Sequence, residues 1–389
     1  MKDFIFEVGT KILFGKNQLS KLPNEVKKYG DRVLICYGGG SIKKNGIYDE
    51  VVKLFRENEI DFYELSGIEP NPRLTSVVEG IKIARDNNVD LILPIGGGSA
   101  IDCAKLIAVG YYYDGDPWDI VVGDKKPTKA LPIGTILTIA ATGSEMDTAS
   151  VITNLKTREK LGWGSHLVLP KFSFLNPEFT FTVNKYHTIA GTCDIMSHTM
   201  ENYFSMDEGV FLQDSFSEAV LKTCIKYLPC AIENPYDYEA RANLLWANSW
   251  AINGLLSEGK TNGWSVHAME HELSAYYDVT HGMGLAVLTP NWLSYILSDK
   301  TKGKIAEFGY NVFNLKKSDD VFKDAKNAIK ALRDFFDSVG VAKNLRELGI
   351  DDSLLREMAH MAVTHKGGFI NGYVPLNEDD VYEIYKLSL

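Results

Sequence analysis

The sequence predicts an α/β domain with a mostly parallel sheet over residues 1–180, followed by an all-helical domain over residues 181–389. Two observations support this prediction. Short apolar runs alternate with amphipathic segments in the first part of the chain, whereas beyond Asn176 and Pro177 the apolar residues recur with the spacing of helices. A chain of 389 residues is also longer than one ordinary hydrophobic core supports, so we expect two domains.

The individual elements follow from these patterns. In the first part we expect strands within 32–37, 61–65, 90–95, 131–139 and 171–176, and helices within 51–58, 74–88 and 98–110. Strands that alternate with helices form mostly parallel sheets, which helices cover on both faces. In the second part we expect helices within 189–203, 237–256, 324–340 and 380–387, with few strand-like runs.

Composition and charge exclude several classes of protein. The 45% of hydrophobic and 24% of charged residues are typical of a soluble globular protein. A net charge of −10 without a dense stripe of Lys and Arg disfavours nucleic acid as a partner. No segment reaches about eighteen uncharged apolar residues and the amino terminus resembles no export signal, so we expect neither a membrane span nor secretion.

Cysteine usage indicates the compartment. The chain has five cysteines, an odd number, and they lack the spacing of a metal-binding knuckle. Most lie in apolar surroundings, as buried free thiols do, which indicates a reducing cytoplasm. They are Cys36, Cys103, Cys193, Cys224 and Cys230.

Two copies of the sequence GGGS follow apolar strands. Gly96–Ser99 comes after "LILPI" and precedes a helix, so free backbone N–H groups and the positive end of the helix dipole face the turn. A pyrophosphate fits there because glycine lets the backbone approach closely. The alternative is a tight turn that needs positive φ. The pattern also differs from the spaced G-x-G-x-x-G fingerprint of dinucleotide-binding folds.

The second copy, Gly38–Ser41, bears on the choice of cofactor. An acidic residue at such a strand end would accept a hydrogen bond from a ribose 2′-hydroxyl and repel a 2′-phosphate. This turn has a serine instead, and Lys43 and Lys44 come soon after it. The turn therefore favours NADP over NAD, unless the lysines are only solvated helix charges.

Three of the eight histidines lie within residues 267–281. His267 and His271 are four residues apart and so share one face of a helix, as do Asp194 and His198 in the helix at 189–203. Imidazole and carboxylate groups on two facing helices form divalent metal sites in helical domains. The alternative is a chance cluster of exposed or hydrogen-bonded core histidines.

Together these segments resemble the iron-containing (group III) alcohol dehydrogenase family, and within it the NADPH-dependent butanol dehydrogenases and related aldehyde reductases. The similarity runs nearly end to end. It rests on "ILFGK" at 12–16, "YGGGSIKKNG" at 37–46, "IEPNP" at 68–72, "IGGGSAIDCAK" at 95–105, "ATGSE" at 141–145 and the two histidine-containing segments. The resemblance implies a Rossmann-like nucleotide-binding domain followed by a helical metal-binding domain, the architecture shared with dehydroquinate synthase.

The resemblance also implies roles for individual residues. Asp194, His198, His267 and His281 would be the metal ligands. His271 would lie beside the metal site as a proton-relay group, with the alternative that it only braces a ligand.

Further residues would bind NADP(H) according to the same resemblance. Asp102 would lie near the nicotinamide ribose, with the alternative that it is an acid favoured by the helix dipole. Lys160 would lie along the cofactor, with the alternative of a solvated surface lysine, and Thr142 and Ser144 have the alternative of turn residues around Gly143. The complete set is Gly97, Gly98 and Ser99 at the pyrophosphate; Asp102, Thr138, Thr142, Ser144 and Lys160 along the cofactor; and Gly39, Gly40 and Ser41, with Asn71 nearby, around the adenosine 2′-phosphate.

The expected chemistry is the reversible reduction of a small aldehyde to a primary alcohol such as butanol. One carboxylate and three neutral imidazoles leave a divalent ion able to polarise an aldehyde oxygen while NADPH donates hydride, in a cleft between the domains that closes to exclude water. The resemblance implies Fe²⁺, although zinc suits the same donors. Residues 186–204 and 261–289 contain no Lys or Arg, so we expect a neutral substrate.

Three alternative functions stay open, two of them from other classes. A metal-dependent lyase resembling dehydroquinate synthase would need basic side chains around its acidic substrate, and the ligand segments contain none. A relative of zinc-dependent glycerol dehydrogenase would have three ligands in place of four. A non-catalytic metal- or nucleotide-binding protein would bind metal without turnover. The resemblance further implies a homodimer.

Overall fold

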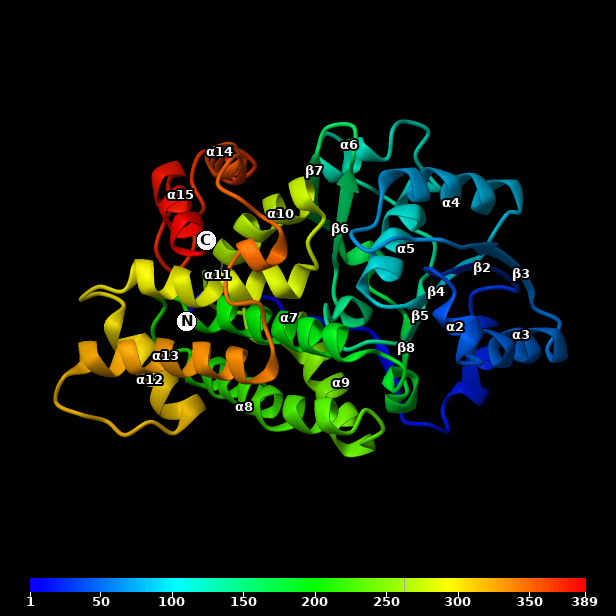
Figure 1. Cartoon of the computed structure of the whole chain (residues 1–389). Helices are drawn as coiled ribbons and strands as arrows, with labels where there is room; N and C mark the ends of the chain where they lie inside the picture. Colours follow the sequence, from blue (N-terminus) through cyan, green and yellow to red (C-terminus); the bar gives the residue numbers. More distant parts are fainter. Residues whose placement is uncertain (262) are drawn as a thin grey trace. The chain divides into compact units, whose positions relative to one another are not determined.

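The computed structural model describes residues 1–261 and 263–389. Asn262 lies outside the described residues. It belongs to the stretch 261–289, which contains no Lys or Arg. The chain divides into two compact units (Figure 1). The helical unit comprises Met1–Phe6, Lys185–Asn234 and Trp246–Leu389, and the α/β unit comprises Glu7–Asn184 and Pro235–Leu245.

The α/β unit contains a six-stranded sheet in the order β1-β8-β5-β4-β2-β3. All paired strands run parallel, as the alternation of strands and helices predicts. The strands are β1 (Lys11–Phe14), β2 (Arg32–Cys36), β3 (Asp61–Leu65), β4 (Leu91–Gly96), β5 (Gly134–Leu137) and β8 (Phe172–Leu175). The chain passes from β2 outward to β3 and then returns to the other side of β2 with β4, so the strand order reverses between β2 and β4.

Helices cover both faces of this sheet. In β2, Val33 and Ile35 belong to a core cluster with residues of α1 and α3, whereas Leu34 and Cys36 belong to a second cluster with residues of α4 and α5. This alternation explains why residues 33–36 of the strand are all apolar. The helices are α1 (Leu22–Val26), α2 (Ser41–Lys44), α3 (Ile47–Glu57), α4 (Leu74–Asp86), α5 (Gly98–Gly110) and α6 (Trp118–Val121), with short 3-10 turns at Leu19–Lys21, Ser144–Met146, His166–Val168 and Pro177–Thr180.

Three strands were not predicted: β1 and the two strands of an antiparallel hairpin, β6 (Ala149–Asn154) and β7 (Glu159–Gly164). Residues 156–160 form the turn and the start of β7, and a solvated surface was only the alternative for Lys160 in this polar segment. The hairpin is held by tertiary contacts, for example the hydrogen bond from the Thr153 amide to the Pro72 carbonyl. Such contacts override the local preference of a hydrophilic segment.

The helical unit is built around α7 (Lys185–Tyr203), which is buried at every residue from Thr188 to Tyr203. α7 packs against α8 and α11, and α10 packs against α11. The other helices are α8 (Phe211–Glu233), α9 (Tyr238–Ile252), α10 (Ser265–Tyr277), α11 (His281–Ile296), α12 (Lys302–Phe313), α13 (Val321–Val339), α14 (Leu355–Thr364) and α15 (Glu378–Leu387), with a 3-10 turn at Arg346–Leu348. The four helices predicted in this part of the chain are confirmed.

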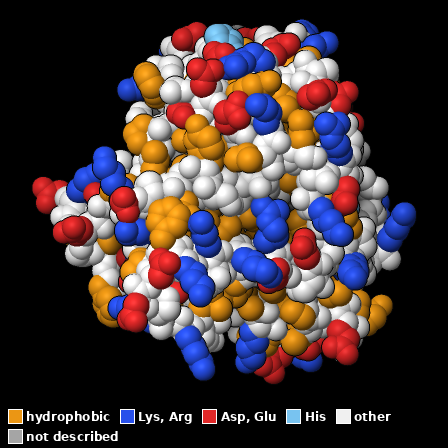
Figure 2. All heavy atoms as spheres, turned by 60° about the vertical axis from the view of Figure 1, so that its left-hand side comes forward, with side chains coloured by type: hydrophobic (Ala, Val, Ile, Leu, Met, Phe, Trp, Pro, Cys, Tyr) orange, Lys and Arg blue, Asp and Glu red, His pale blue; other side chains and the backbone are white. Residues whose placement is uncertain are grey.

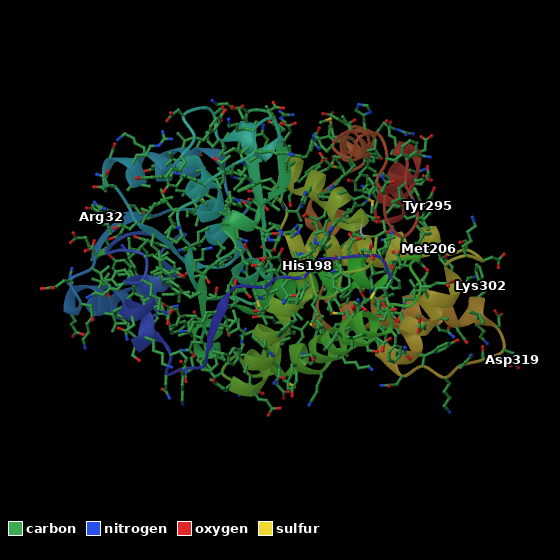
Figure 3. All side chains as sticks on the ribbon, turned by 180° about the vertical axis from the view of Figure 1, so that it is seen from behind. Arg32, His198, Met206, Tyr295, Lys302 and Asp319 are labelled. Atoms are coloured by element: carbon green, nitrogen blue, oxygen red, sulfur yellow. The ribbon has the colours of Figure 1, made fainter. Side chains whose placement is uncertain are left out.

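The surface of the molecule carries many charged side chains, unlike the buried core. On the face shown in Figure 2, Lys and Arg side chains lie among Asp and Glu side chains. Seen from behind, His198 lies inside the helical unit, while Lys302 and Asp319 lie at its edge (Figure 3). Within residues 1–261 and 263–389, no helix is both long and apolar enough to cross a membrane.

The two units differ from the predicted division by four residues at the boundary, 181–184, which belong to the α/β unit, and in two further segments. Residues 1–6 were placed in the first domain and belong to the helical unit, where the Met1 amino group donates to the Glu208 carbonyl. Residues 235–245 were placed in the second domain and belong to the α/β unit, where Leu245 packs with Ile101. Neither exchange has a signal in local sequence patterns, because both depend on contacts between residues far apart in the chain.

Candidate active site

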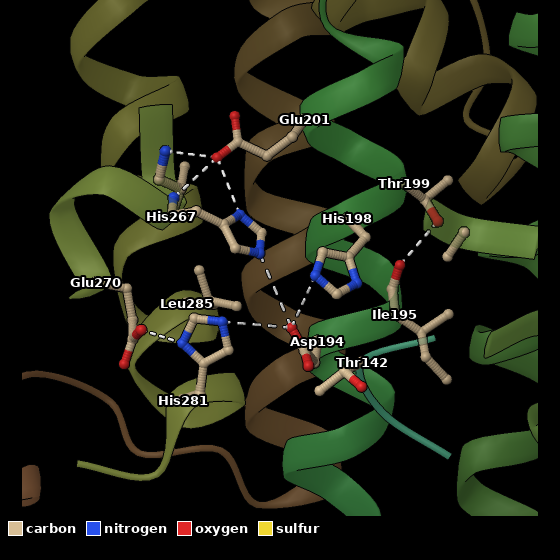
Figure 4. A network of polar contacts seen from close by, with 12 residues as sticks. Thr142, Asp194, Ile195, His198, Thr199, Glu201, His267, Glu270, His281 and Leu285 are labelled. Atoms are coloured by element: carbon tan, nitrogen blue, oxygen red, sulfur yellow. Dashed lines mark hydrogen bonds and ion pairs between the residues drawn. The ribbon is translucent and has the colours of Figure 1, made fainter. Parts of the chain in front are cut away.

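Four predicted ligand side chains converge inside the helical unit (Figure 4). Asp194 and His198 lie one turn apart on α7, His267 lies on α10, and His281 is the first residue of α11. Asp194 Oδ1 lies 3.5 Å from His198 Nε2, 3.9 Å from His267 Nε2 and 3.8 Å from His281 Nε2. The three imidazoles therefore present their Nε2 atoms to one carboxylate oxygen.

These separations fit a divalent metal ion. Ligand atoms at about 2.0–2.2 Å from a tetrahedral ion lie roughly 3.3–3.6 Å from one another. The three distances from Asp194 Oδ1, 3.5–3.9 Å, are close to this range. Ligand atoms of Asp194, His267 and His281 all lie within 4.8 Å of one another. One oxygen and three nitrogen donors suit iron, zinc and related ions.

The His198 ring is placed by other rings. It stacks on His267, with ring centroids 4.8 Å apart and planes inclined by 13°, and meets Trp264 edge-on at 5.7 Å. Burial, followed by the nearby charge of His267, lowers the pKa of His198 well below its usual value. The imidazole is therefore neutral, as a metal ligand must be.

Glu201 supports His267 from α7. Its carboxylate accepts hydrogen bonds from the backbone amides of Ser265, Val266 and His267 at 2.9, 2.6 and 2.9 Å. These are amides of the first turn of α10, which have no partners within the helix. The same carboxylate lies 3.2 Å from His267 Nδ1. Burial raises the pKa of Glu201 to about 7, although the three amides act in the opposite direction.

Glu270 supports His281 in a similar way. It is fully buried on α10, and its Oε2 contacts His281 Nδ1. Its Oε1 accepts a hydrogen bond from Ser274 Oγ at 2.5 Å. Neither Glu201 nor Glu270 was predicted to have a role. A carboxylate three residues after a ligand histidine is the only signal that the sequence offers for Glu270.

His271, the predicted proton-relay residue, lies next to the cluster. It is partly exposed, and its ring centroid is 5.6 Å from that of His281 and 6.5 Å from that of His267. His271 also forms a second group of ligand atoms with Glu270 and His281, all within 4.8 Å of one another. Its position suits both a proton relay and a bracing group, so its role stays a prediction.

Gly282 allows α11 to approach α7 closely beside the cluster. A Cβ atom at Gly282 would lie 1.9 Å from the carbonyl oxygen of Ala190, which is one turn before Asp194. A backbone atom cannot move aside as a flexible side chain would. The glycine after His281 therefore determines how close the first turn of α11 lies to the Asp194 helix.

We expect Gly282→Ala to weaken metal binding at least about tenfold and to cost roughly 1–3 kcal/mol of stability, because the added methyl group displaces α11 and the adjoining His281. Chelator competition and urea denaturation measure the two effects. Gly303→Ala is the matched control, since Gly303 also lies early in a helix and its added Cβ would meet no atom within 4 Å. Equal metal affinity in the two variants would contradict this prediction.

The two GGGS turns follow β2 and β4, the adjacent parallel strands between which the strand order reverses. Ligands of open α/β sheets bind at such a point, outside the carboxyl ends of the strands. Gly40 has a φ of 91°, which favours glycine. A Cβ at Gly98, the first residue of α5, would lie 2.3 Å from Thr142 Cγ2, so this position also has no room for a side chain.

The other residues predicted to bind the cofactor lie at or near the ends of these strands, on the turns and on the β6–β7 hairpin. Asn71 is buried and has a φ of 51°, and Lys160 is 4% exposed on β7, which excludes the solvated-surface alternative. Ser144 follows Gly143, whose φ is 70°, as expected for a turn. Exposed or partly exposed positions are occupied by Gly39, Gly40 and Ser41 after β2, Gly97 and Ser99 after β4, and Thr138 and Thr142 after β5.

Asp102 makes hydrogen bonds within the protein. Its carboxylate accepts from Ser144 Oγ at 2.6 Å and from the Val151 amide at 2.9 Å. Burial is the largest cause that raises the pKa of Asp102 to about 6. The side chain therefore ties α5 to the loop and strand that follow β5, and contact with the nicotinamide ribose stays a prediction.

Lys105, for which no role was predicted, is fully buried on α5. Its ammonium group donates to Asp147 Oδ1 at 2.5 Å, to the Asp147 carbonyl at 3.0 Å and to the Ala149 carbonyl at 2.7 Å. A lysine within the otherwise apolar run "AKLIAV" is the one signal for such a buried ion pair. Lys105 holds the same loop as Asp102.

Comparison with known proteins identifies the family. The family described as "Iron-containing alcohol dehydrogenase" matches residues 9–177, and the one described as "Fe-containing alcohol dehydrogenase family, C-terminal" matches residues 188–389. The chain belongs to the iron-containing alcohol dehydrogenase family. The predicted family membership and fold are thus confirmed, and the chain is an enzyme of this family.

Relatives of this alcohol dehydrogenase family cover the whole chain. NADH-dependent butanol dehydrogenase A of Clostridium acetobutylicum is 58% identical over 388 residues, with 100% of both chains covered. NADPH-dependent aldehyde reductase YqhD of Escherichia coli is 36% identical, over 94% of this chain and 95% of the relative. The crystal structure of NADH-dependent butanol dehydrogenase A from Thermotoga maritima has a TM-score of 0.95 at 38% identity and covers 100% of this chain and 99% of that one.

Proposed function

We propose that this iron-containing alcohol dehydrogenase interconverts small primary alcohols, such as butanol, and their aldehydes by hydride transfer with NADP(H). The observation that carries the proposal is the convergence of three imidazole Nε2 atoms on one buried carboxylate oxygen. The names of relatives along the whole chain, butanol dehydrogenase and aldehyde reductase, support the same reaction.

Asp194, His198, His267 and His281 would hold a divalent metal ion. When bound, the ion would act as a Lewis acid that polarises the substrate oxygen. The donor atoms suit both iron and zinc, and intrinsic affinity favours zinc, so the assignment of Fe²⁺ rests on the family. His198 is neutral, and the Nδ1 atoms of His267 and His281 each contact a carboxylate. His271, whose ring centroid lies 5.6 Å from that of His281, would serve as the proton relay.

The two glycine turns would bind the pyrophosphate and the adenosine ribose of the cofactor. A preference for NADPH over NADH is proposed because Ser41 replaces the acidic residue that would repel a 2′-phosphate, and because Lys43 is exposed nearby. Lys43 also lies 3.3 Å from Glu64, which offsets part of its charge. The names of relatives include NADH-dependent and NADPH-dependent enzymes, so the preference needs a direct measurement.

A neutral substrate is proposed because no Lys or Arg occurs in the stretches that contain the four ligands, 186–204 and 261–289. We also propose a cytoplasmic homodimer. The free cysteines, four of them buried, suit a reducing compartment.

Anaerobic purification, metal analysis and assays with straight-chain aldehydes test the proposed function. We expect about one divalent ion per chain and a steady loss of NADPH absorbance with butanal, with kcat/KM for NADPH at least about tenfold above that for NADH. A higher kcat/KM with NADH would overturn the cofactor preference alone. Metal binding without oxidation of either cofactor would overturn the reaction and favour a lyase, which returns its nicotinamide unchanged, or a binding protein.

A further inference from the structure

Two buried carboxylates lie behind two of the three imidazoles, on the side away from Asp194 (Figure 4). Glu201 contacts Nδ1 of His267, and Glu270 contacts Nδ1 of His281. We propose that Glu201 and Glu270 are positioning residues that hold His267 and His281 as Nε2 ligands and thereby set the affinity of the site for divalent metal. This inference rests on the metal site of the proposed function.

The geometry of the rings supports the proposal. A neutral imidazole carries one proton, and a carboxylate at Nδ1 keeps the proton there, which leaves the Nε2 lone pair for a metal ion. In both His267 and His281 it is Nε2 that faces Asp194 Oδ1, at 3.9 and 3.8 Å. The carboxylate also increases the electron density of the ring, which strengthens the metal–nitrogen bond.

Glu201 is itself fixed in place. Its Oε1 accepts from both the backbone amide and the ring Nδ1 of His267, at 2.9 and 3.2 Å. Its Oε2 accepts from the Ser265 amide. A carboxylate bound to the first turn of α10 through several amides cannot rotate away, so the ligand ring and the helix that carries it share one anchor.

Glu270 is fixed by a hydroxyl and by close packing. Ser274 Oγ donates to its Oε1, and Glu270 is fully buried. A Cβ at Gly284 would lie 2.8 Å from Glu270 Cγ, so α11 leaves room for this side chain. α10 thus supplies one proposed ligand, His267, and the support for another, His281.

His198 provides a contrast within the same cluster. No described residue is a hydrogen-bond partner of its Nδ1, and its ring is held by stacking on His267 and contact with Trp264. Carboxylate support is therefore confined to the ligands from α10 and α11. The effect of removing it should appear in the metal–imidazole bonds of those two residues.

The test is Glu270→Gln, measured with Co²⁺ alone. We expect its affinity for Co²⁺, determined by competition with a chromogenic chelator, to fall about 10–100-fold. The visible absorption of bound Co²⁺ should shift as well, because it reports the ligand field and not the stability of the fold. Glu201→Gln should weaken Co²⁺ binding similarly. If the Glu201 variant does not fold, the result for Glu270→Gln alone tests the proposal.

Glu272→Gln is the matched control. Glu272 lies on the same helix, is 2% exposed, and its Oε1 is 2.9 Å from Nδ1 of His365, which is not among the proposed ligands. Its variant should keep the Co²⁺ affinity within about threefold and the parental spectrum. If Glu270→Gln binds Co²⁺ with the parental affinity and spectrum, the inference is overturned while the metal site stands. If the unaltered protein binds no Co²⁺, the metal site of the proposed function is wrong as well.

Discussion

His198→Ala should lose both bound metal and aldehyde reduction. Four-ligand sites bind divalent ions with about 10–16 kcal/mol, so the loss of one ligand costs roughly 3 kcal/mol, or about a hundredfold or more in affinity. The buried Asp194 carboxylate, whose Oδ1 lies 3.5 Å from His198 Nε2, would also lose its nearest proposed co-ligand. Metal analysis after gel filtration and an NADPH-linked assay measure the two losses.

His360→Ala is the control for that experiment. His360 lies on α14 in the same unit, with 61% of its side chain exposed beside Glu378. We expect this variant to keep its metal and at least about half of its activity, because exposed pairs contribute less than about 1 kcal/mol. A His198→Ala protein that stays active without metal would refute the ligand assignment, whatever the control shows.

Lys105→Met should destabilise the α/β unit by about 3–5 kcal/mol, because it leaves the buried Asp147 carboxylate without its cation. The lysine also donates to the carbonyls of Asp147 and Ala149, so two further acceptors lose a partner. The midpoint of urea denaturation, followed by circular dichroism, measures the change. Adding Asp147→Asn should recover part of the loss, since no buried charge then remains unpaired.

Lys82→Met is the matched control for Lys105→Met. Lys82 forms an ion pair with Asp86 on α4, and its side chain is 75% exposed. Exposed pairs four residues apart contribute about 0.3–0.5 kcal/mol, so this variant should unfold at nearly the parental urea concentration. If Lys105→Met shifts the urea midpoint as little as Lys82→Met does, the prediction is wrong. Breaking the buried ion pair would then destabilise the protein no more than breaking an exposed one.

Local sequence patterns were sufficient to predict most of the strands and helices. β2 to β5 and β8 were predicted because they are short, largely apolar runs between amphipathic segments, and α3 to α5 because their apolar residues recur at helical spacing. β1 begins with an exposed lysine and is buried only at Leu13, and β7 begins in a polar segment. Neither carries enough periodicity for prediction, and their pairing with distant residues determines their conformation.

The candidate site also contains both residues that the sequence predicted and residues that it did not. Asp194 and His198 were singled out because a spacing of four places two ligand types on one helix face, and the resemblance to the family added His281. The structure brings all four side chains together, and metal binding by them stays a prediction. Glu201, Glu270 and Gly282 were not assigned roles, because each acts on a residue from another helix and spacing along one helix does not reveal such a partner.

The amino-acid sequence by itself determined the periodic features of this protein: the alternation of strands and helices, the two glycine turns and the ligand types at helical spacing. Tertiary structure alone decided which imidazole nitrogen faces Asp194, which carboxylates stand behind the rings, and that Lys105 is buried in an ion pair. The physical reason is the separation along the chain of the residues that interact. Periodicity records which face of an element is buried, whereas hydrogen bonds between elements depend on distances that arise only when helices remote in the chain pack together.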